Sequence, residues 1–412
     1  MHYIRFLRAP KLTFQGDRKN AWSLNVVLTV TTDLGDSFLA HDEPVKIKVS
    51  FGWEQPLSAG KSKPMRLAGE KTLRWTSGMR VLKADIPAQH LESKSRLPQP
   101  GADEGPLRVY AWAGSGVSAE TAANVSMAGF NDEAGRIMPL WTDIQTPGSV
   151  APTTCLRRLR LGDRSPGALI EVEEDIGESI ARHVWDAGIM VVSRLWLLSD
   201  GDPGLCAGHP LAMNTLEYLL LGSDAVNILE LGCGVGIFGI GLARMLSREG
   251  GSDKSTILMT DLPEAEERAG ANIDRLATTG APSIRPEYEN LDWDDGRQGD
   301  FGPQVGSRFW DLVVLSDCTY NADALPALID TWTAIHKQNL SKRPGAEVTT
   351  RVLVAMKVRH ADESRLWELV KEDGWAVAEQ AVMPLPMLGG EPQEIFLFLF
   401  ENKNQGLSGI PN

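Results

Sequence analysis

Cysteine is scarce in this chain of 412 residues, which contains four of them. They are Cys155, Cys206, Cys233 and Cys318. No two form a CxxC pair, and no histidine cluster lies near them at the spacing of metal ligands. We therefore expect neither a disulfide framework nor a metal site, and a reducing compartment fits this pattern.

Long hydrophobic runs are also absent. The longest apolar stretches, residues 188–198 and 213–221, are too short or too interrupted to span a bilayer. The opening residues, 1–14, contain no extended apolar segment of the kind found in secretory signals. We expect no membrane association, and we expect a protein of the cytoplasm or the nucleus.

Positive charge is in short supply, because 41 lysines and arginines face 54 aspartates and glutamates, for a formal net charge of −13. This balance disfavours a nucleic-acid partner held by a broad basic surface, and a basic protein partner matches it better. A chain of this length is long for a single hydrophobic core, so we expect two domains.

The first part of the chain has the period of antiparallel strands, in which one face of the sheet meets a core and the other meets water. Two runs of alternating apolar residues show it: Leu24, Val26, Leu28 and Val30, then Val45, Ile47, Val49 and Phe51. Residues 107–114 are a further strand candidate, and stretches rich in proline and glycine separate these runs. We predict a smaller β-rich domain over residues 1–165. It contains no chemical motif, so its role is that of a structural or partner-binding module.

From residue 166 onward, strand patterns alternate with helix patterns. The expected strands cover residues 168–175, 227–232, 256–262, 311–317, 351–358, 375–382 and 394–401, and the expected helices cover residues 176–198, 237–247, 264–278, 324–340 and 362–372. Such alternation indicates βαβ units and a parallel sheet covered on both faces. No helix fits between the last two strands, so they form an antiparallel hairpin.

The predicted fold is therefore α/β. It is a seven-stranded Rossmann-like sheet of the methyltransferase kind with a terminal antiparallel hairpin, over residues 166–402, and residues 403–412 are a flexible tail. The hairpin distinguishes this sheet from that of most dinucleotide dehydrogenases.

A glycine-rich segment, residues 230–239, follows one of these strands and opens a helix. Gly232, Gly234 and Gly236 allow a sharp turn and a close approach of the backbone to a ligand, because they have no Cβ atom. The amide groups at the start of the helix then face that ligand. We assign the three glycines to cofactor binding.

The same segment leaves two cofactors open. Gly234, Gly236 and Gly239 satisfy GxGxxG, and Asp261 lies at the distance expected for a residue that binds a nucleotide ribose, so an NAD enzyme is an alternative. A plain turn between strand and helix is the other. Glu230 favours S-adenosyl-L-methionine, because a carboxylate repels phosphate and attracts an ammonium group. Asp261 would accept hydrogen bonds from the ribose hydroxyl groups.

Four segments resemble the family-16 lysine methyltransferases of the methyltransferase-like-21 type. They are HVWDAGIMV at residues 183–191, ILELGCGVGIFG at 228–239, ENLDW at 289–293 and SDCTY at 316–320. The resemblance covers about residues 170–402, as in a fungal member that carries an extra N-terminal β-rich domain. The glycine loop is common to all seven-stranded methyltransferases, whereas the combination of the other three segments is specific.

The resemblance implies roles for five residues. Trp185 and Trp293 would contact the cofactor, and the backbone of Ser316 would bracket it. Asp317 and Tyr320 would line the acceptor pocket as the catalytic pair, because they match the DxxY motif of the family. The simpler alternatives are core packing for the aromatic residues and a turn cap for Asp317.

The resemblance thus predicts an S-adenosylmethionine-dependent enzyme that methylates a lysine side chain of a protein, such as a translation factor. A neutral amine would attack the methyl group in line, without a metal and without a covalent enzyme intermediate. Three alternatives stay open: a small-molecule amine or histidine acceptor, a non-catalytic cofactor-binding scaffold, and an NAD dehydrogenase.

Overall fold

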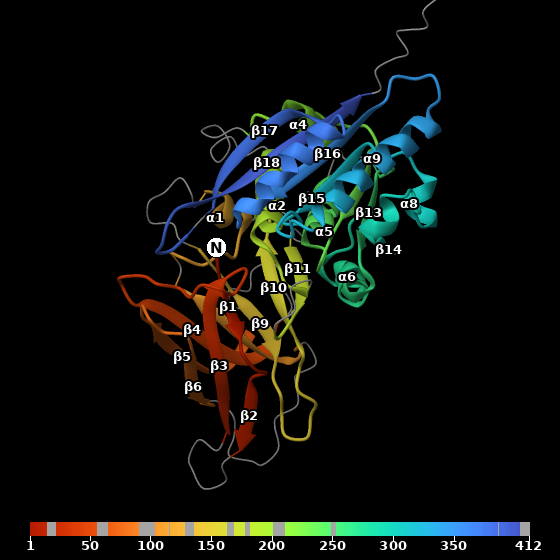
Figure 1. Ribbon diagram of the computed structural model, residues 1–412. Coiled ribbons are helices and arrows are strands. Elements are labelled where there is room, and N and C mark those ends of the chain that lie inside the picture. The colour runs from red at the N-terminus through yellow and green to blue at the C-terminus, as the bar shows by residue number, and fades with distance from the viewer. Residues whose placement is uncertain are drawn as a thin grey trace, which may run out of the picture. The chain divides into compact units, whose positions relative to one another are not determined.

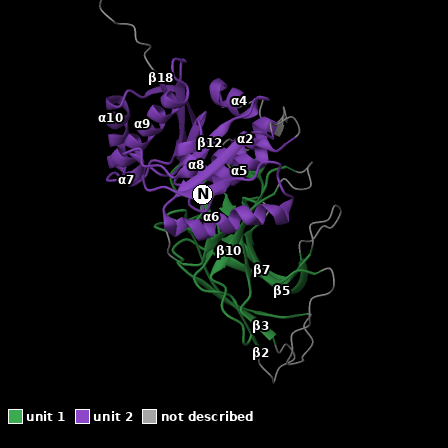
Figure 2. Ribbon diagram, turned by 90° about the vertical axis from the view of Figure 1, so that its right-hand side faces the viewer, with its two compact units in different colours: residues 1–183, 386–392 green, residues 184–385, 393–412 purple. Residues whose placement is uncertain are grey.

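The computed structural model describes residues 1–14, 22–55, 65–89, 104–114, 116–127, 136–162, 169–177, 182–200, 211–248, 253–385 and 387–403. The chain divides into two compact units (Figure 2): Met1–His183 with Pro386–Pro392, and Val184–Leu385 with Gln393–Asn412. Cys206 and the expected tail, apart from Lys403, lie outside the described residues.

The described residues of the first unit form two sheets and a short helix, α1 (Ala122–Met127). One sheet has the order β2 (Lys11–Phe14), β3 (Trp22–Thr32), β1 (His2–Phe6), β8 (Ile137–Met138), and β6 (Leu82–Pro87) also pairs with β3. The other sheet has the order β11 (Leu169–Asp175), β10 (Thr154–Arg160), β9 (Leu140–Asp143), β7 (Leu107–Ala113), β4 (Val45–Glu54), β5 (Met65–Trp75). The first unit is therefore β-rich, as the sequence predicts.

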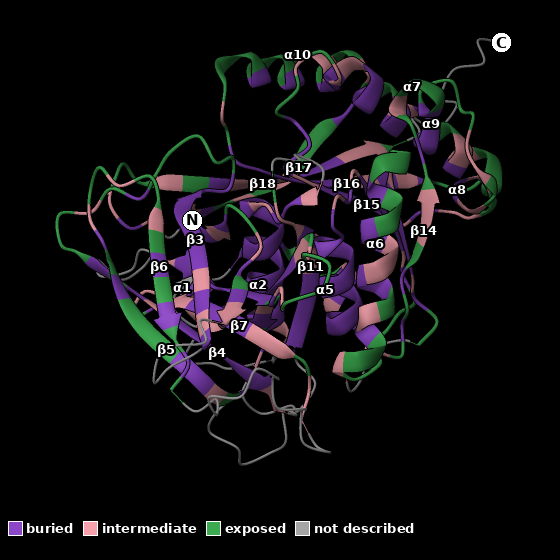
Figure 3. Ribbon diagram, turned by 90° about the horizontal axis from the view of Figure 1, so that it is seen from below, coloured by how far each residue is buried: buried purple, intermediate pink, exposed green. Residues whose placement is uncertain are grey.

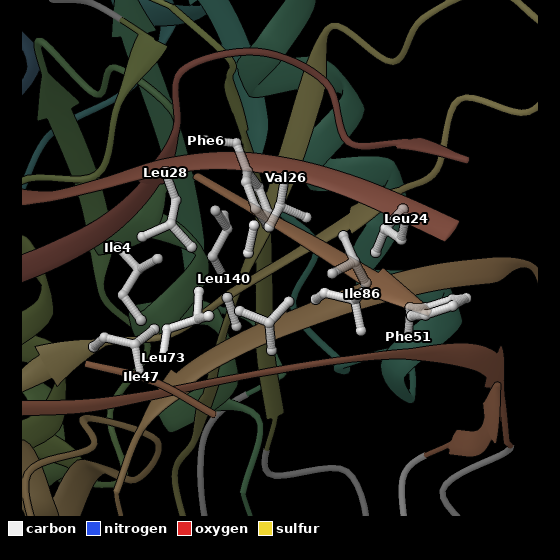
Figure 4. Packing of buried hydrophobic residues seen from close by; sticks show 14 of the residues in the cluster. Ile4, Phe6, Leu24, Val26, Leu28, Ile47, Phe51, Leu73, Ile86 and Leu140 are labelled. Carbon is white, nitrogen blue, oxygen red and sulfur yellow. The ribbon is translucent and has the colours of Figure 1, made fainter. Parts of the chain in front are cut away.

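One hydrophobic core lies between these two sheets. In Figure 4, side chains of β1, β3, β4, β5, β6 and β9 point toward one another, among them Ile4, Val26, Ile47, Leu73 and Ile86. The alternating residues named from the sequence are all buried in this core, since their parity places them on the inner faces.

The boundary between the units differs from the expected one. The strand expected to open the second domain, β11, pairs antiparallel with β10 along its whole length and so belongs to the first unit. The division follows His183 instead of residue 165. The expected helix over residues 176–198 is also shorter, because α2 spans Asp186–Asp200.

The second unit contains a sheet of seven strands among the described residues (Figure 1). Its order is β14 (Glu287–Asn290), β13 (Thr256–Asp261), β12 (Asn227–Leu231), β15 (Leu312–Ser316), β16 (Thr349–Met356), β18 (Gln393–Lys403), β17 (Ala376–Leu385). The first five strands run parallel, and β18 is antiparallel to both of its neighbours. This order confirms the predicted fold class. The seventh strand, however, is the polar edge strand β14, which the sequence pattern did not reveal, in place of β11.

Helices cover both faces of this sheet. The second unit contains α2, α4 (Asn214–Leu221), α5 (Ile237–Leu246), α6 (Pro263–Arg275), α7 (Trp293–Gly296), α8 (Pro303–Ser307), α9 (Leu325–Lys342) and α10 (Arg365–Glu372), with 3₁₀ turns η3 (Leu276–Thr279) and η4 (Ala361–Ser364). Apolar residues of α9 and α10 share a core with β12, β13, β15 and β16. On the other face α5 packs against α2, because Gly188 of α2 lies against Ile237 and Gly241 of α5 lies against Val192. Helix α5 is buried along its length (Figure 3).

The carboxyl ends of β12, β13 and β15 lie at the same edge of the sheet, because these strands are parallel neighbours. Asp261 and Ser316 end β13 and β15, and the three glycines, Asp317 and Tyr320 follow β12 and β15, at the edge where ligands of open α/β sheets bind. No helix among the described residues is long and apolar enough to cross a bilayer.

Candidate functional site

The loop between β12 and α5 requires its glycines. Gly232, Gly234 and Gly236 have φ angles of 66°, 54° and 84°, a left-handed region that a residue with a Cβ atom adopts only at a cost. The Cys233 amide donates to the carbonyl oxygen of Thr260 at 3.0 Å, which ties the loop to β13. The loop is therefore a turn held against β13, in which Gly232 and Gly234 are half-buried.

Gly232 is where three of the four motifs meet. A Cβ atom on this residue would lie 2.6 Å from Cys318 Sγ and 3.3 Å from Trp293 Cζ2. Cys318 belongs to the SDCTY segment and Trp293, which is half-buried, begins α7 in the LDW segment. The fold thus brings Trp293 to the glycine loop, and its role in cofactor binding stays a prediction.

Asp261 lies at the tip of β13 and faces the loop. Its Oδ2 accepts a hydrogen bond from the Gly234 amide at 2.7 Å, and its Oδ1 accepts one from the Leu262 amide at 2.7 Å. Burial raises the pKa of this carboxyl group. The sequence placed Asp261 beside the glycine loop, and the structure has it there.

Glu230 lies beneath the loop. Its neighbours in β12, Leu229 and Leu231, belong to the core shared with α9, so Glu230 points to the opposite face. There its Oε2 accepts a hydrogen bond from the Gly239 amide in α5 at 3.0 Å. Burial raises the pKa of Glu230 to about 8; the Gly239 hydrogen bond opposes this shift and the charge of Asp261 adds to it.

Trp185 and Tyr320 form an aromatic pair. Their rings are almost parallel, with an interplanar angle of 12° and centroids 6.4 Å apart. Trp185 is half-buried and precedes α2, whereas Tyr320 is 43% exposed and follows β15. The guanidinium carbon of Arg359 lies 5.1 Å from the centroid of the Trp185 ring.

Asp317 is buried next to this pair and both of its carboxylate oxygens are engaged. Oδ1 accepts a hydrogen bond from Arg359 Nη1 at 2.6 Å, and Oδ2 accepts one from the Ala187 amide at 2.7 Å, in the first turn of α2. The φ angle of Asp317 is 55°, in the left-handed region that favours glycine. Asp317 thus accepts a hydrogen bond at the start of α2, 130 residues away in the sequence.

A second buried ion pair lies nearby. Lys357 Nζ, just after β16, is 2.9 Å from Asp186 Oδ2 at the start of α2. Sequence reasoning did not single out Asp186, Lys357 or Arg359. The signal was an aspartate inside the VWDAG segment and two basic residues directly after an apolar strand.

Ser316 ends β15 and lies against α2. Its Oγ is 3.3 Å from the point that a Cβ atom on Gly188 would occupy, and its carbonyl oxygen accepts from Cys318 Sγ at 3.3 Å. Ser316 is the last residue of β15 and directly precedes Asp317.

The assigned residues form two groups. Glu230, the glycine loop, Asp261 and Trp293 surround the end of β12. Ser316, Asp317 and Tyr320 lie at or after the end of β15, where Trp185 stacks with Tyr320 and Arg359 contacts both Trp185 and Asp317. The resemblance assigned Trp185 to the cofactor, whereas the ring contacts of Trp185 here are with Tyr320 and Arg359.

The first group fits S-adenosylmethionine. A Cβ atom on residue 232 would fill the space beside the loop, which glycine leaves open. Asp261 offers acceptors for ribose hydroxyl groups, and Trp293 offers an aromatic surface. Glu230 is 1% exposed beneath the loop, where its Oε2 accepts a hydrogen bond from the Gly239 amide, so its contact in this structure supports the turn between β12 and α5.

Comparison with known proteins finds similar sequences and folds. A UPF0665 family protein of Schizosaccharomyces pombe is 24% identical over 365 residues, which is 88% of this chain and 90% of the relative.

Two solved structures are also similar. Magnesium protoporphyrin IX methyltransferase from Synechocystis, with bound SAH, is 13% identical, with a TM-score of 0.28 over 47% of this chain and 84% of that chain. A precorrin-6y C5,15-methyltransferase from Geobacter metallireducens is 12% identical, with a TM-score of 0.28 over 46% and 90%.

The chain also matches a protein family. A family model described as lysine methyltransferase matches residues 165–373, about half of the chain, and this range contains the glycine loop and both groups of site residues. The chain therefore belongs to the lysine methyltransferase family, and S-adenosylmethionine is its cofactor.

Proposed function

We propose that this protein methylates the side-chain amine of a lysine in a protein. The observation that carries the proposal is the parallel aromatic pair Trp185 and Tyr320 beside the Asp317–Arg359 ion pair, at the edge of the sheet that bears the cofactor loop. Aromatic faces pack against an aliphatic chain and attract a methylated ammonium group. Membership of the lysine methyltransferase family supports the same acceptor.

When bound, S-adenosylmethionine supplies a methyl group on a cationic sulfur, and the amine nitrogen takes it as an N–C bond forms and the S–C bond breaks. The lysine must first lose its proton, although its ordinary pKa is about 10.4. Trp185 and Tyr320 orient the amine and stabilise the positive charge that it acquires. Water takes the proton, since Asp317 already accepts two hydrogen bonds.

The acidic balance of the chain supports a basic protein as the substrate, such as a translation factor. We expect the protein to act in the cytoplasm or the nucleus, where such substrates occur.

The test is methylation of a cell lysate with S-adenosylmethionine labelled in its methyl group, followed by mass spectrometry of the labelled protein. We expect label on a lysine with the wild type, and at least about tenfold weaker cofactor binding by calorimetry for Asp261→Ala, which loses the acceptor for ribose hydroxyl groups. Asp274→Ala, in the same region of the chain but at an exposed pair with Arg285, is the matched control and should behave like the wild type.

Label in the small-molecule fraction would indicate a small amine acceptor instead, and label on histidine would change the acceptor residue. A protein that binds the cofactor but labels nothing across lysates would be a scaffold. Each of these results contradicts the proposed acceptor. Unchanged cofactor affinity of Asp261→Ala would contradict the assigned site.

A further inference from the structure

The segment that follows β16 reaches back across the acceptor side of the site. It contains Lys357, Val358, Arg359 and His360 and leads into the turn η4. Only 7% of the Arg359 side chain is exposed to solvent. Arg359 lies 42 residues from Asp317 along the chain, yet the two side chains form one of the buried ion pairs of the site.

Arg359 makes two contacts with residues assigned to the site. Its Nη1 donates to Asp317 Oδ1 at 2.6 Å, and its guanidinium carbon lies 5.1 Å from the centre of the Trp185 ring. A guanidinium group is planar, so it can bond a carboxylate through its edge while its face lies over an aromatic ring. A lysine ammonium cannot do both in the same way, so the type of residue matters here.

The backbone of Arg359 is itself held in place. Glu363, which is 2% exposed, accepts hydrogen bonds through Oε1 from the amides of Arg359 at 2.7 Å and His360 at 3.0 Å. Its Oε2 accepts a hydrogen bond from Thr319 Oγ1 at 3.0 Å. Two cross-links, Arg359–Asp317 and Glu363–Thr319, therefore join the segment after β16 to the segment after β15.

These contacts determine what Asp317 can do. Its carboxylate is shared between Arg359 and the start of α2, so its charge is balanced and its orientation is fixed from two sides. Asp317 in turn accepts a hydrogen bond from the amide of Ala187, which lies two residues after Trp185 in the chain. Arg359 thus restrains Trp185 both directly, by lying over its ring, and indirectly, through Asp317.

We propose that Arg359 is a positioning residue for methyl transfer, which holds Trp185 and Asp317 in the arrangement that receives the acceptor amine. This inference rests on the proposed function, since it assigns the Trp185 side of the site to the acceptor. It predicts that Arg359 affects turnover and the acceptor, and leaves the binding of S-adenosylmethionine near the glycine loop almost unchanged.

The experiment compares Arg359→Met, Arg359→Lys, Asp317→Asn and the double variant Arg359→Met with Asp317→Asn. The kcat and KM are measured on the lysate protein that the wild type labels, and cofactor affinity is measured by calorimetry. We expect Arg359→Met to lower kcat by about 10- to 100-fold, with a cofactor Kd within about twofold of that of the wild type. The kcat of Arg359→Lys should lie between the values of the wild type and Arg359→Met. The loss of kcat in the double variant should be smaller than the product of the two single losses, because both variants break the Arg359–Asp317 contact.

Arg351→Met is the matched control, since Arg351 lies in β16 and pairs with Glu401 at 2.9 Å in the same sheet. It should keep the wild-type kcat and KM. Multiplicative losses in the double variant, or equal losses of kcat and cofactor affinity in Arg359→Met, would overturn the proposal. If Arg359→Met does not fold, Arg359→Lys carries the comparison.

A second readout does not need the acceptor. The near-ultraviolet circular dichroism of Trp185 is obtained as the difference between each protein and its Trp185→Phe variant. This signal should change in Arg359→Met and stay unchanged in Arg351→Met. A wild type that labels nothing would contradict the proposed function alone, whereas an unaltered Trp185 signal would contradict the role of Arg359.

Discussion

The Glu230 carboxyl group keeps its proton at neutral pH in the folded protein. Burial raises its pKa from 4.5 to about 8, although the Gly239 amide bonds to it and opposes the shift, and the nearby Asp261 charge raises it further. The unfolded chain loses this proton near pH 4.5. Between these two values the folded state holds more protons, so this residue lowers stability progressively as the pH rises from 4.5 to 8.

Glu230→Gln should remove this pH dependence. The variant's free energy of unfolding minus that of the wild type should rise with pH by at most about 1.4 kcal/mol per pH unit between pH 5 and pH 8. Below pH 5 this difference should change little. Urea unfolding at three pH values within that range measures it. Glu372→Gln, at an exposed glutamate that ends α10, is the control. A relative stability of Glu230→Gln that stays constant with pH would show that Glu230 titrates normally.

At the scale of elements, the turn between β12 and α5 needs glycine both for its own backbone conformation and for its contacts with distant residues. The left-handed φ of Gly232 is a local requirement, but the lack of space beside it comes from Cys318, which lies far away in the sequence. The polar sequence of β14 has no alternation, and its strand forms because β13 offers unpaired backbone groups at the edge of the sheet.

Gly232→Ala should therefore lose stability and cofactor affinity together. The left-handed conformation costs about 1–2 kcal/mol for a residue with a Cβ atom, and the contact with Cys318 adds to it. We expect cofactor binding weaker by about tenfold or more, because the methyl group also displaces Trp293. Calorimetry and thermal unfolding measure the two effects.

Gly270→Ala in α6 is the matched control, since nothing lies within 4 Å of its added Cβ atom. It should leave binding unchanged and raise stability by up to about 1 kcal/mol. Wild-type affinity in Gly232→Ala would show that the space beside Gly232 is not used by the cofactor.

At the scale of the whole molecule, the chain passes between the two units three times. Residues 386–392 follow β17 and precede β18, both in the second unit, yet they belong to the first. Leu388 is buried in the core of the first unit, and a Cβ atom on Gly389 would overlap the carbonyl oxygen of Ala40. The β-rich unit therefore contains residues from two separate parts of the chain.

Gly389→Ala should destabilise the protein by more than about 3 kcal/mol, because a left-handed φ of 72° is combined with an overlap against backbone that cannot move aside. Gly390→Ala, whose φ is 90° but whose added Cβ atom meets nothing within 4 Å, should lose only about 1–2 kcal/mol. Urea unfolding compares them. Equal losses in the two variants would mean that the segment does not pack as described.

The period of the sequence alone was sufficient for the alternating strands of the first unit, the terminal hairpin and the other strands and helices after residue 227 apart from β14, α7 and α8. Apolar spacing reveals such elements because it follows from the geometry of one element at a time. The glycine loop with Asp261 was predictable for the same reason, since β12, its turn and β13 are neighbours in the chain. The membership of β11 was not, because its residues are compatible with either sheet and only pairing with β10 decides it.

The sequence by itself thus determined the kind of fold, the cofactor loop and the residues at the ends of β13 and β15. Tertiary structure alone decided how their side chains are used: Glu230 turns beneath the loop to Gly239, and Asp317 is joined to Arg359 and the start of α2. The physical reason is that hydrogen bonds and ion pairs depend on distances of about 3 Å between atoms that the chain brings together from remote positions. No local pattern encodes such distances.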